Sequence, residues 1–281
     1  MVSMRDIKDR IANVSSTEQI INAMDAVASS KLHKIRAQME GVRPLYNELK
    51  RQVEKAGRYE AAATHTFYQQ RDIKSSLYVV ITSDQGFAGS YNTNILKKAL
   101  EHMNEGKNEK ILVIGSKGRD YFRRHNKNII REITDISDSK MYFGTEDLAK
   151  WITDIYLSEE VDEIFIAYTD FKNVMSHEAR IEKMLPIVEM LSEKRESEVE
   201  QEYEQGIETF IDHVVPLYLH MNLFRAFSES HTSEQAARKV SMDAASTNAE
   251  DIIDDLKLQY NRQRQAAITQ ELSEIIGGSN I

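Results

Sequence analysis

The C-terminal part of the chain has no natural helix stop over about seventy residues. Residues 207–276 contain no glycine and a single proline, Pro216, and these are the residues that most often end a helix. At about 1.5 Å rise per residue, a continuous helix of this length measures about 100 Å. A compact body built from a chain of this size has a radius of gyration of only about 20 Å. The stretch therefore predicts a helix that projects and needs a partner.

The N-terminal part carries a repeat that suits such a partner. Its apolar residues recur in steps of three or four, which is the pattern of a coiled-coil stripe. The predicted stripe is Met4, Ile7, Ile11, Val14, Thr17, Ile21, Met24, Ala28, Leu32, Ile35, Met39 and Val42. Ser3 and Asp6 predict a capping box at its start, and we expect the helix to kink at Pro44 and continue towards Gly57.

A matching seam is predicted in the C-terminal helix, with one small slip in register between residues 244 and 245. Its members are Ala237, Val240, Ala244, Ala245, Ala249, Ile252, Leu256, Tyr260, Gln263 and Ala267. Two ordinary amphipathic helices of a bundle are the alternative, but typical globular helices span only about 8 to 20 residues. We therefore expect the two ends of the chain to pair as a coiled coil.

Between residues 74 and 205 the pattern changes to short β-rich runs that alternate with helical segments. Strands are expected at 77–82, 110–115, 129–132, 163–169, 174–177, 179–186 and 199–203. Helices are expected at 92–103, 118–125 and 145–157. This alternation predicts a Rossmann-like α/β body with a mostly parallel sheet. The expected division is 1–58 for the N-terminal helix, 74–205 for the body and 207–278 for the C-terminal helix.

The composition argues against several classes of function. A formal net charge of −9 disfavours nucleic acid as the main partner, and the absence of cysteine excludes disulfides and thiolate sites. The N-terminus lacks the apolar run of a signal peptide, and no stretch approaches the roughly 18 apolar residues of a membrane span. A basic cluster at Lys31, His33, Lys34 and Arg36 suggests acidic protein partners.

No segment has the pattern of an active site. The turns 83–90 and 115–118 lack the glycines of a dinucleotide fingerprint and the ending of a P-loop, so tight strand-to-helix turns are the favoured interpretation. His213, His220 and His231 lack the one-turn spacing of zinc ligands. We expect no catalytic residue, no cofactor and no metal.

The ends of the chain resemble the gamma subunit of F-type ATP synthases. The N-terminal match is TEQIINAM at 17–24 with VASSKL at 27–32, and the C-terminal match is SEQAAR at 233–238 with YNRQRQAAITQELSEIIGG at 260–278. The turn SDQGFAGSYN at 83–92 is similar to the strand-turn-helix of the family. The departures from the family pattern are Gln85 for arginine, Ala88 for cysteine, Ala26 and Lys239 for methionine, and Asp243 for lysine.

The resemblance implies an antiparallel coiled coil that acts as the central stalk, or rotor, of an ATP synthase. The coiled coil would fill the cavity of a hexamer of alternating alpha and beta subunits, and the body would bind epsilon and the membrane ring of c subunits. Ion flow would turn ring and stalk, and the stalk would drive each catalytic beta subunit through its nucleotide-binding states. The chain itself would be non-catalytic, present once per complex and peripheral on the cytoplasmic face of the bacterial cell membrane.

The resemblance also implies a set of rotor–stator contacts. The expected contact residues are Met24, Lys31, Lys34, Glu234, Arg238, Arg264, Gln265 and Thr269. Of these, Arg264, Gln265 and Thr269 would form a polar catch with a loop of beta, and Lys31 and Lys34 would meet an acidic loop of beta. The other three would lie where the two helices face each other or the moving beta loop.

The helix lengths add an expectation of their own. A helix of about 70 residues outruns one of about 50 by about 25 to 30 Å, and the unpaired end would carry the apolar tip Ile268, Leu272, Ile275 and Ile276. Exposed apolar surface of this kind marks a contact site. A coiled-coil tether or scaffold with an α/β domain is the main alternative and predicts no apolar overhang. A nucleotide-using α/β enzyme is a weaker alternative and predicts nucleotide binding by the body.

Overall fold

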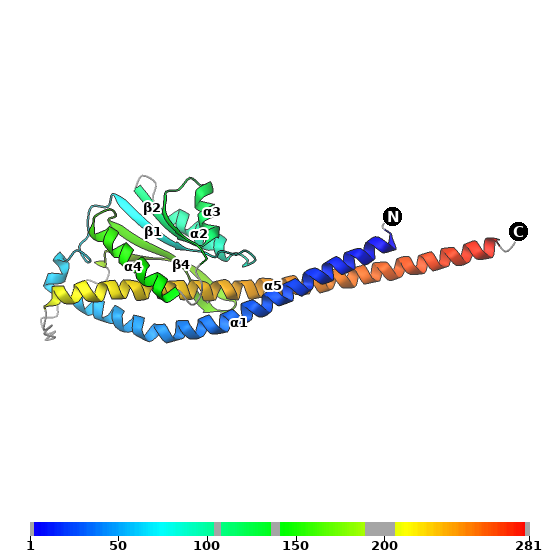
Figure 1. Cartoon of the computed structure of the whole chain (residues 1–281), viewed down its shortest axis with the longest axis horizontal. Coiled ribbons are helices and arrows are strands. Elements are labelled where there is room, and N and C mark those ends of the chain that lie inside the picture. The colour runs from blue at the N-terminus through cyan, green and yellow to red at the C-terminus, as the bar shows by residue number, and fades with distance from the viewer. Residues whose placement is uncertain (1–2, 104–107, 136–140, 189–205, 279–281) are drawn as a thin grey trace. The chain divides into compact units, whose positions relative to one another are not determined.

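The computed structural model describes residues 3–103, 108–135, 141–188 and 206–278, and Figure 1 shows its helices and strands. Two long helices, α1 (Met4–Ala56) and α5 (Ile207–Gly278), begin and end the fold. Contacts group the chain into two compact units, which are a coiled-coil unit of Met1–Ser30 with Arg238–Ile281 and a body unit of Lys31–Ala237. Both helices therefore contribute residues to both units.

The start of α1 and the end of α5 pair in opposite directions within the coiled-coil unit (Figure 1). Lys239 Nζ on α5 lies 3.4 Å from Asp25 Oδ1 on α1. Further along, Ser246 Oγ donates a hydrogen bond of 2.8 Å to Asn22 Oδ1. Residue numbers rise on one helix as they fall on the other, so the coiled coil is antiparallel.

The N-terminal helix begins as the sequence predicts and continues beyond Pro44, while the kink expected at Pro44 stays a prediction. The Ser3 amide donates to Asp6 Oδ2 at 3.0 Å, and the Asp6 amide donates to Ser3 Oγ at 3.1 Å, which confirms the capping box. The hydrogen bonds from Ser3 hold the pKa of the Asp6 carboxyl below its ordinary value. The helix then runs through Gly41 and Pro44 to Ala56.

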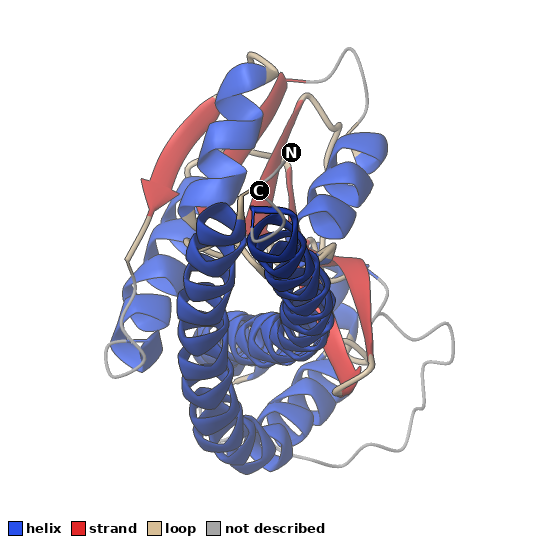
Figure 2. Ribbon diagram, turned by 90° about the vertical axis from the view of Figure 1, so that its right-hand side faces the viewer, coloured by secondary structure: helices blue, strands red, loops and turns tan. Residues whose placement is uncertain are grey.

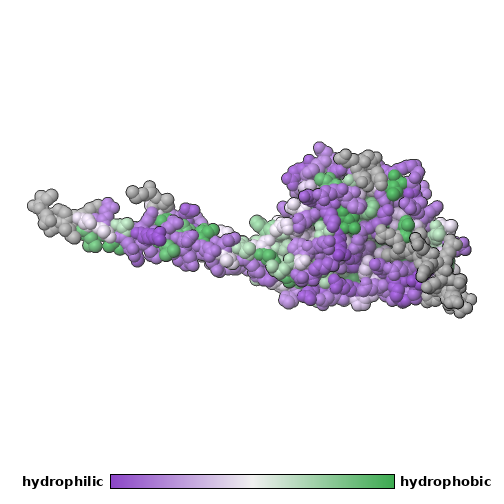
Figure 3. Space-filling model, turned by 180° about the vertical axis from the view of Figure 1, so that it is seen from behind, coloured by the Kyte–Doolittle hydropathy of each residue, from purple (hydrophilic) through white to green (hydrophobic). Residues whose placement is uncertain are grey.

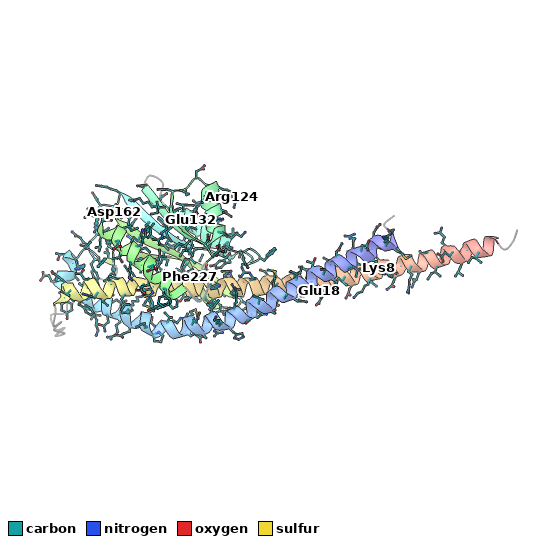
Figure 4. All side chains as sticks on the ribbon, in the orientation of Figure 1. Lys8, Glu18, Arg124, Glu132, Asp162 and Phe227 are labelled. Carbon is teal, nitrogen blue, oxygen red and sulfur yellow. The ribbon has the colours of Figure 1, made fainter. Side chains whose placement is uncertain are left out.

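The predicted seams are right in spacing and wrong at three positions. On α1, Thr17 is exposed, while Glu18 beside it is half-buried and keeps the alternation of three- and four-residue steps (Figure 4). On α5, Ala244 is exposed, and Ile252 is 48% exposed while Ile253 is 8% exposed. The observed seam there passes through Met242, Ala245, Ala249, Ile253 and Leu256. The change of register lies in two successive four-residue steps, from 245 to 249 and from 249 to 253, and not between 244 and 245 as predicted.

The body unit holds a five-stranded sheet with strand order β3-β2-β1-β4-β5. Its strands are β1 (Ser75–Ile81), β2 (Asn108–Ile114), β3 (Ile129–Ile133), β4 (Glu163–Asn173) and β5 (Ser176–Leu185). Among these described strands, β5 alone pairs in antiparallel fashion, which confirms the predicted, mostly parallel sheet. The parallel strands are connected by α2 (Tyr91–His102), α3 (Ser116–Arg124) and α4 (Met141–Leu157), and a 3-10 turn, η1 (Glu60–Thr64), follows α1. The strand expected at 199–203 lies outside the described residues.

One predicted break between strands is wrong. The sequence suggests separate strands at 174–177 and 179–186, but β4 continues to Asn173 and a two-residue turn leads directly into β5. Asn173 Oδ1 accepts a hydrogen bond of 3.0 Å from the Met175 amide, which closes this turn. Val174 packs against a small apolar cluster of α1, β4 and α5. Val174 therefore lies in the turn with its side chain packed, although valine is typical of strands.

The sheet separates two apolar cores, as the ribbon in Figure 2 illustrates with helices on both sides of the strands. Leu77 and Val79 of β1 pack in one cluster with α1, α4 and α5. Tyr78 and Val80 pack in the other with α2 and the Phe122 side chain of α3. The alternation follows from the two-residue period of a pleated strand.

The portions of the long helices that lie in the body unit are part of its core. Leu49, Val53 and Ala56 of α1 are buried in the same cluster as the strands, and so are α5 residues such as Ile211 and Leu219. Both helices are therefore anchored on the sheet within the body unit.

Candidate partner-binding surfaces

The last part of α5 has no opposing residue on α1. In an antiparallel pair of helices, the numbers of two facing residues have a nearly constant sum, which is 264 for Asp25 and Lys239 and 268 for Asn22 and Ser246. Met4, the first residue of α1, therefore faces positions 260 to 264 of α5. Beyond this point the exposed fractions of Ile268, Leu272 and Ile275 are 49%, 54% and 68%. The apolar overhang expected from the helix lengths is therefore present, and Figure 3 shows apolar surface along this unit. The side chain of Ile276 lies outside the described part of the chain.

The polar residues expected to form a catch lie beside this apolar tip. Arg264, Gln265 and Thr269 are all exposed. The Thr269 hydroxyl donates a hydrogen bond of 2.9 Å to the Gln265 carbonyl of its own helix. The side chains of Arg264 and Gln265 are thus accessible to another subunit.

The other predicted contact residues differ in accessibility. Met24 is half-buried and Arg238 is 5% exposed, and both belong to the coiled-coil unit. In the body unit, Lys31 and Lys34 are exposed, whereas Glu234 is half-buried and accepts a hydrogen bond of 3.3 Å from the neighbouring glutamine side chain. Among these five, only the two lysines are exposed.

A charged cluster on the coiled coil was not predicted as a site. Lys239 Nζ lies 3.4 Å from Asp25 Oδ1 and 3.5 Å from Asp243 Oδ2. Desolvation lowers the pKa of Lys239, but the two carboxylates outweigh it and hold the pKa above its ordinary value. Two departures from the family pattern, Lys239 and Asp243, therefore compensate each other. The spacing of four residues between opposite charges on a helix is the signal that points to this pair.

The turn after β1 is closed by groups of the protein itself. Asp84 Oδ1 accepts a hydrogen bond of 2.8 Å from the amide of Ser116, the first residue of α3, and its Oδ2 accepts one of 3.0 Å from the Asp135 amide. In nucleotide-binding folds a phosphate occupies such a helix N-terminus. Here the Asp84 carboxylate lies at the N-terminus of α3, which favours the interpretation of the 115–118 segment as a structural turn.

Close packing explains the glycines of the second turn. Gly115 has a φ of +96°, and a Cβ atom on it would lie 2.3 Å from the Thr82 carbonyl oxygen. A Cβ on Gly118 would lie 2.6 Å from a methyl group of Val113. The residues at these positions must be glycine for packing and backbone geometry.

Two exposed apolar side chains at one edge of the sheet were not predicted from the sequence. Phe87 follows β1, has a φ of 60° and is 71% exposed, and Met175 in the β4–β5 turn is 78% exposed. Because β1 and β4 are neighbouring parallel strands, their carboxyl ends lie at the same edge. A positive φ is uncommon for an aromatic residue, and sequence pattern alone does not report either φ or exposure in a short turn.

The three histidines singled out in the sequence have local roles. His213 Nδ1 lies 2.7 Å from the Thr209 carbonyl oxygen, and His220 Nε2 lies 3.2 Å from that of Tyr142. His231 packs edge-on near a phenylalanine ring. In the described ranges, no group of three or more metal-ligating side chains has an arrangement that could hold a metal ion. None of the described helical segments is long and apolar enough to cross a membrane.

A polar pocket of about 600 Å³ lies in the body between α1, β4, β5 and α5. Arg225 lines it, with Nη2 2.7 Å from Glu182 Oε2 and Nη1 2.9 Å from the Tyr168 hydroxyl and 3.2 Å from Glu229 Oε2. Its guanidinium also lies over the Tyr46 ring at 4.7 Å. Burial raises the pKa of Glu229, against the lowering effect of Arg225. One buried cation therefore joins α5 to both strands and to α1.

Comparison with known proteins supports the resemblance over the whole chain. A family model described as ATP synthase matches residues 3–280. The ATP synthase gamma chain of Alkaliphilus metalliredigens is 38% identical over 99% of this chain and 98% of its own length. A protein of Acetobacterium woodii named ATP synthase gamma chain, sodium ion specific, is 37% identical over 99% of this chain and 98% of its own.

Solved structures show the same fold. A chain from the central stalk and c-ring of the Tetrahymena thermophila mitochondrial ATP synthase matches with a TM-score of 0.64 and 24% identity, covering 81% of this chain and 99% of that one. A chain from the rotor of the Euglena gracilis enzyme matches with a TM-score of 0.68 and 18% identity, covering 94% and 98%. With its α/β body between two helices that form an antiparallel coiled coil, and with relatives matched from end to end, the chain belongs to the ATP synthase gamma chain family.

Proposed function

We propose that this gamma chain is the rotating central shaft of an F-type ATP synthase, present once per complex. Its coiled-coil unit turns inside a hexamer of alternating alpha and beta subunits, and its body binds the epsilon subunit and the membrane c-ring. The complex lies at the cytoplasmic face of the cell membrane. The chain carries no catalytic residue, and the chemistry of ATP takes place on the beta subunits as the shaft changes their conformation.

The observation that carries this proposal is the apolar overhang of α5. Ile268, Leu272 and Ile275 are about half exposed or more on a segment that α1 does not cover. Burying a leucine side chain contributes about 1.5–3 kcal/mol, so an enclosing apolar sleeve would stabilise this end. A simple tether has no need of such a surface.

Polar contacts complete the proposed bearing. Arg264 and Gln265 supply donors beside the apolar tip, and Thr269 supplies a hydroxyl oxygen that can accept. We assign the three residues to the catch with a loop of beta. Met24, Glu234 and Arg238 are assigned to the region where the helices face each other or the moving loop of beta. Lys31 and Lys34 are exposed cations suited to an acidic loop.

The tip is tested by comparing two leucines of similar exposure. Leu272→Ser removes apolar surface from the overhang, and Leu157→Ser does the same at the end of α4, where the wild-type leucine is 48% exposed. We expect the first to weaken association with the alpha–beta hexamer by about tenfold or more and the second to leave it unchanged. Binding is measured with purified subunits, and coupled ATP synthesis is measured in membranes.

The same assay tests the polar catch with the double variant Arg264→Ala and Gln265→Ala. Assembly should persist while ATP synthesis falls, because the directional contact with beta is lost. Normal coupling in this variant would remove both residues from the bearing. Equal binding by the two leucine variants would contradict the role of the tip.

A further inference from the structure

Buried polar side chains tie α5 to the sheet of the body. Arg225 is 8% exposed and donates to Glu182 of β5 at 2.7 Å and to Tyr168 of β4 at 2.9 Å. The Tyr168 hydroxyl in turn donates to the other oxygen of Glu182. A closed triangle of hydrogen bonds thus joins the helix to two strands.

A second link lies two turns further along the same helix. Ser230 Oγ accepts a hydrogen bond of 3.0 Å from the Thr169 amide, and Ser233 Oγ donates one of 3.3 Å to the Thr169 carbonyl. Both serines are fully buried. One residue of β4 is therefore held at both of its backbone polar groups by α5.

Stability alone does not account for these links. A buried ion pair is often no more stabilising than apolar residues of the same volume, and α5 already buries many apolar side chains on the sheet. Apolar contacts are non-directional, so they oppose separation more than they oppose rotation or sliding of a helix. Hydrogen bonds weaken steeply when their angle and distance change. The polar links therefore fix the rotation and axial position of α5 on the sheet.

We propose that Arg225, Ser230 and Ser233, with Tyr168, Thr169 and Glu182 as their partners, form the junction through which torque passes between the α/β body and α5. The assignment rests on the proposed shaft function. A twisting force on the sheet loads these bonds first, because they resist the motions that apolar packing permits. They are positioning residues that hold the rotation and axial position of α5 relative to the sheet.

The chain offers a matched control on the same helix. Ser228 and Thr232 are also fully buried, but their hydroxyls donate at 2.7 Å to carbonyl oxygens of α5 itself, those of Phe224 and Ser228. Their removal deletes the same kind of group without cutting a link to the sheet.

The experiment compares two double variants in the assembled, membrane-bound complex. One carries Ser230→Ala and Ser233→Ala, and the control carries Ser228→Ala and Thr232→Ala. Each is assayed for subunit content, for ATP hydrolysis after the membrane sector is detached, and for ATP synthesis driven by an ion gradient. We expect both to assemble and to hydrolyse ATP at near wild-type rates. Synthesis, which works against load, should fall about fivefold in the junction variant only, as expected for lost hydrogen bonds of ordinary strength.

Equal synthesis by the two variants would overturn the junction. Should the junction variant fail to assemble, Tyr168→Phe decides the question in the same assay. This variant deletes one hydroxyl of the triangle and keeps the ring. Wild-type synthesis by Tyr168→Phe would also overturn the proposal. A wild-type complex whose gamma chain does not rotate would refute the shaft function instead, so the two failures are distinguishable.

Discussion

His177 on β5 shows how the fold changes the protonation of a single residue. Its Nδ1 atom is buried and has no hydrogen-bond partner among the described residues, and burial lowers the pKa of its ring below the ordinary value of 6.5. The unfolded chain therefore takes up a proton at a higher pH than the folded chain. The stability that His177 contributes is present above pH 6.5 and is lost as the pH falls through the folded-state pKa.

Replacing His177 by glutamine should reduce the loss of stability on mild acidification. Glutamine keeps a polar side chain of similar size and does not titrate. We expect the free energy of unfolding to fall less between about pH 7.5 and about pH 5.5 in His177→Gln than in the wild type. Urea unfolding at both pH values measures the difference. Identical falls in the two proteins would show that the ring is equally solvated in both states.

At the scale of elements, the hydrophobic period predicts both long helices, their pairing and the order of strands and helices in the body. It fails where the seam contains a charge and where two neighbouring residues are both apolar. On α1, Glu18 lies in the seam, although the uncharged Thr17 beside it looks more suitable. On α5, Ile253 lies in the seam and Ile252 does not. Both residues are apolar, so only contact with the partner helix distinguishes them. Packing against the partner helix determines which of two neighbouring residues is buried, and the hydrophobic period of the sequence alone does not specify it.

The interhelical pair of Lys239 and Asp25 should contribute measurably to the coiled coil. Their side chains are 32% and 28% exposed, so solvent screens them less than it screens surface pairs. A double-mutant cycle with Lys239→Met and Asp25→Asn should give a coupling energy within about 0.2–1 kcal/mol, measured by urea unfolding. The pair Arg36–Glu40, with both side chains 56% exposed, is the control and should couple more weakly. Equal coupling energies would mean that Lys239 and Asp25 are effectively solvated.

At the scale of the whole molecule, the sequence predicts an apolar overhang from helix lengths alone, and exposed Ile268, Leu272 and Ile275 agree with it. It does not predict the buried polar links of Arg225, Ser230 and Ser233. Serine and arginine carry no periodic signal, and their partners on β4 and β5 lie some 43 to 64 positions away in sequence. The division into 1–58, 74–205 and 207–278 remains our proposal for the elements, while contacts group the helix portions Lys31–Ala56 and Ile207–Ala237 with the sheet.

Rotation of the body relative to an immobilised hexamer tests the shaft function most directly. The chain has no cysteine, so Arg124→Cys at an exposed position of α3 gives a single attachment point on this subunit for a bead. With the hexamer fixed to a surface and ATP supplied, the bead should rotate in one direction, in repeated steps. A bead that stays in place, or moves without direction, while the same complex hydrolyses ATP at its normal rate would contradict the account.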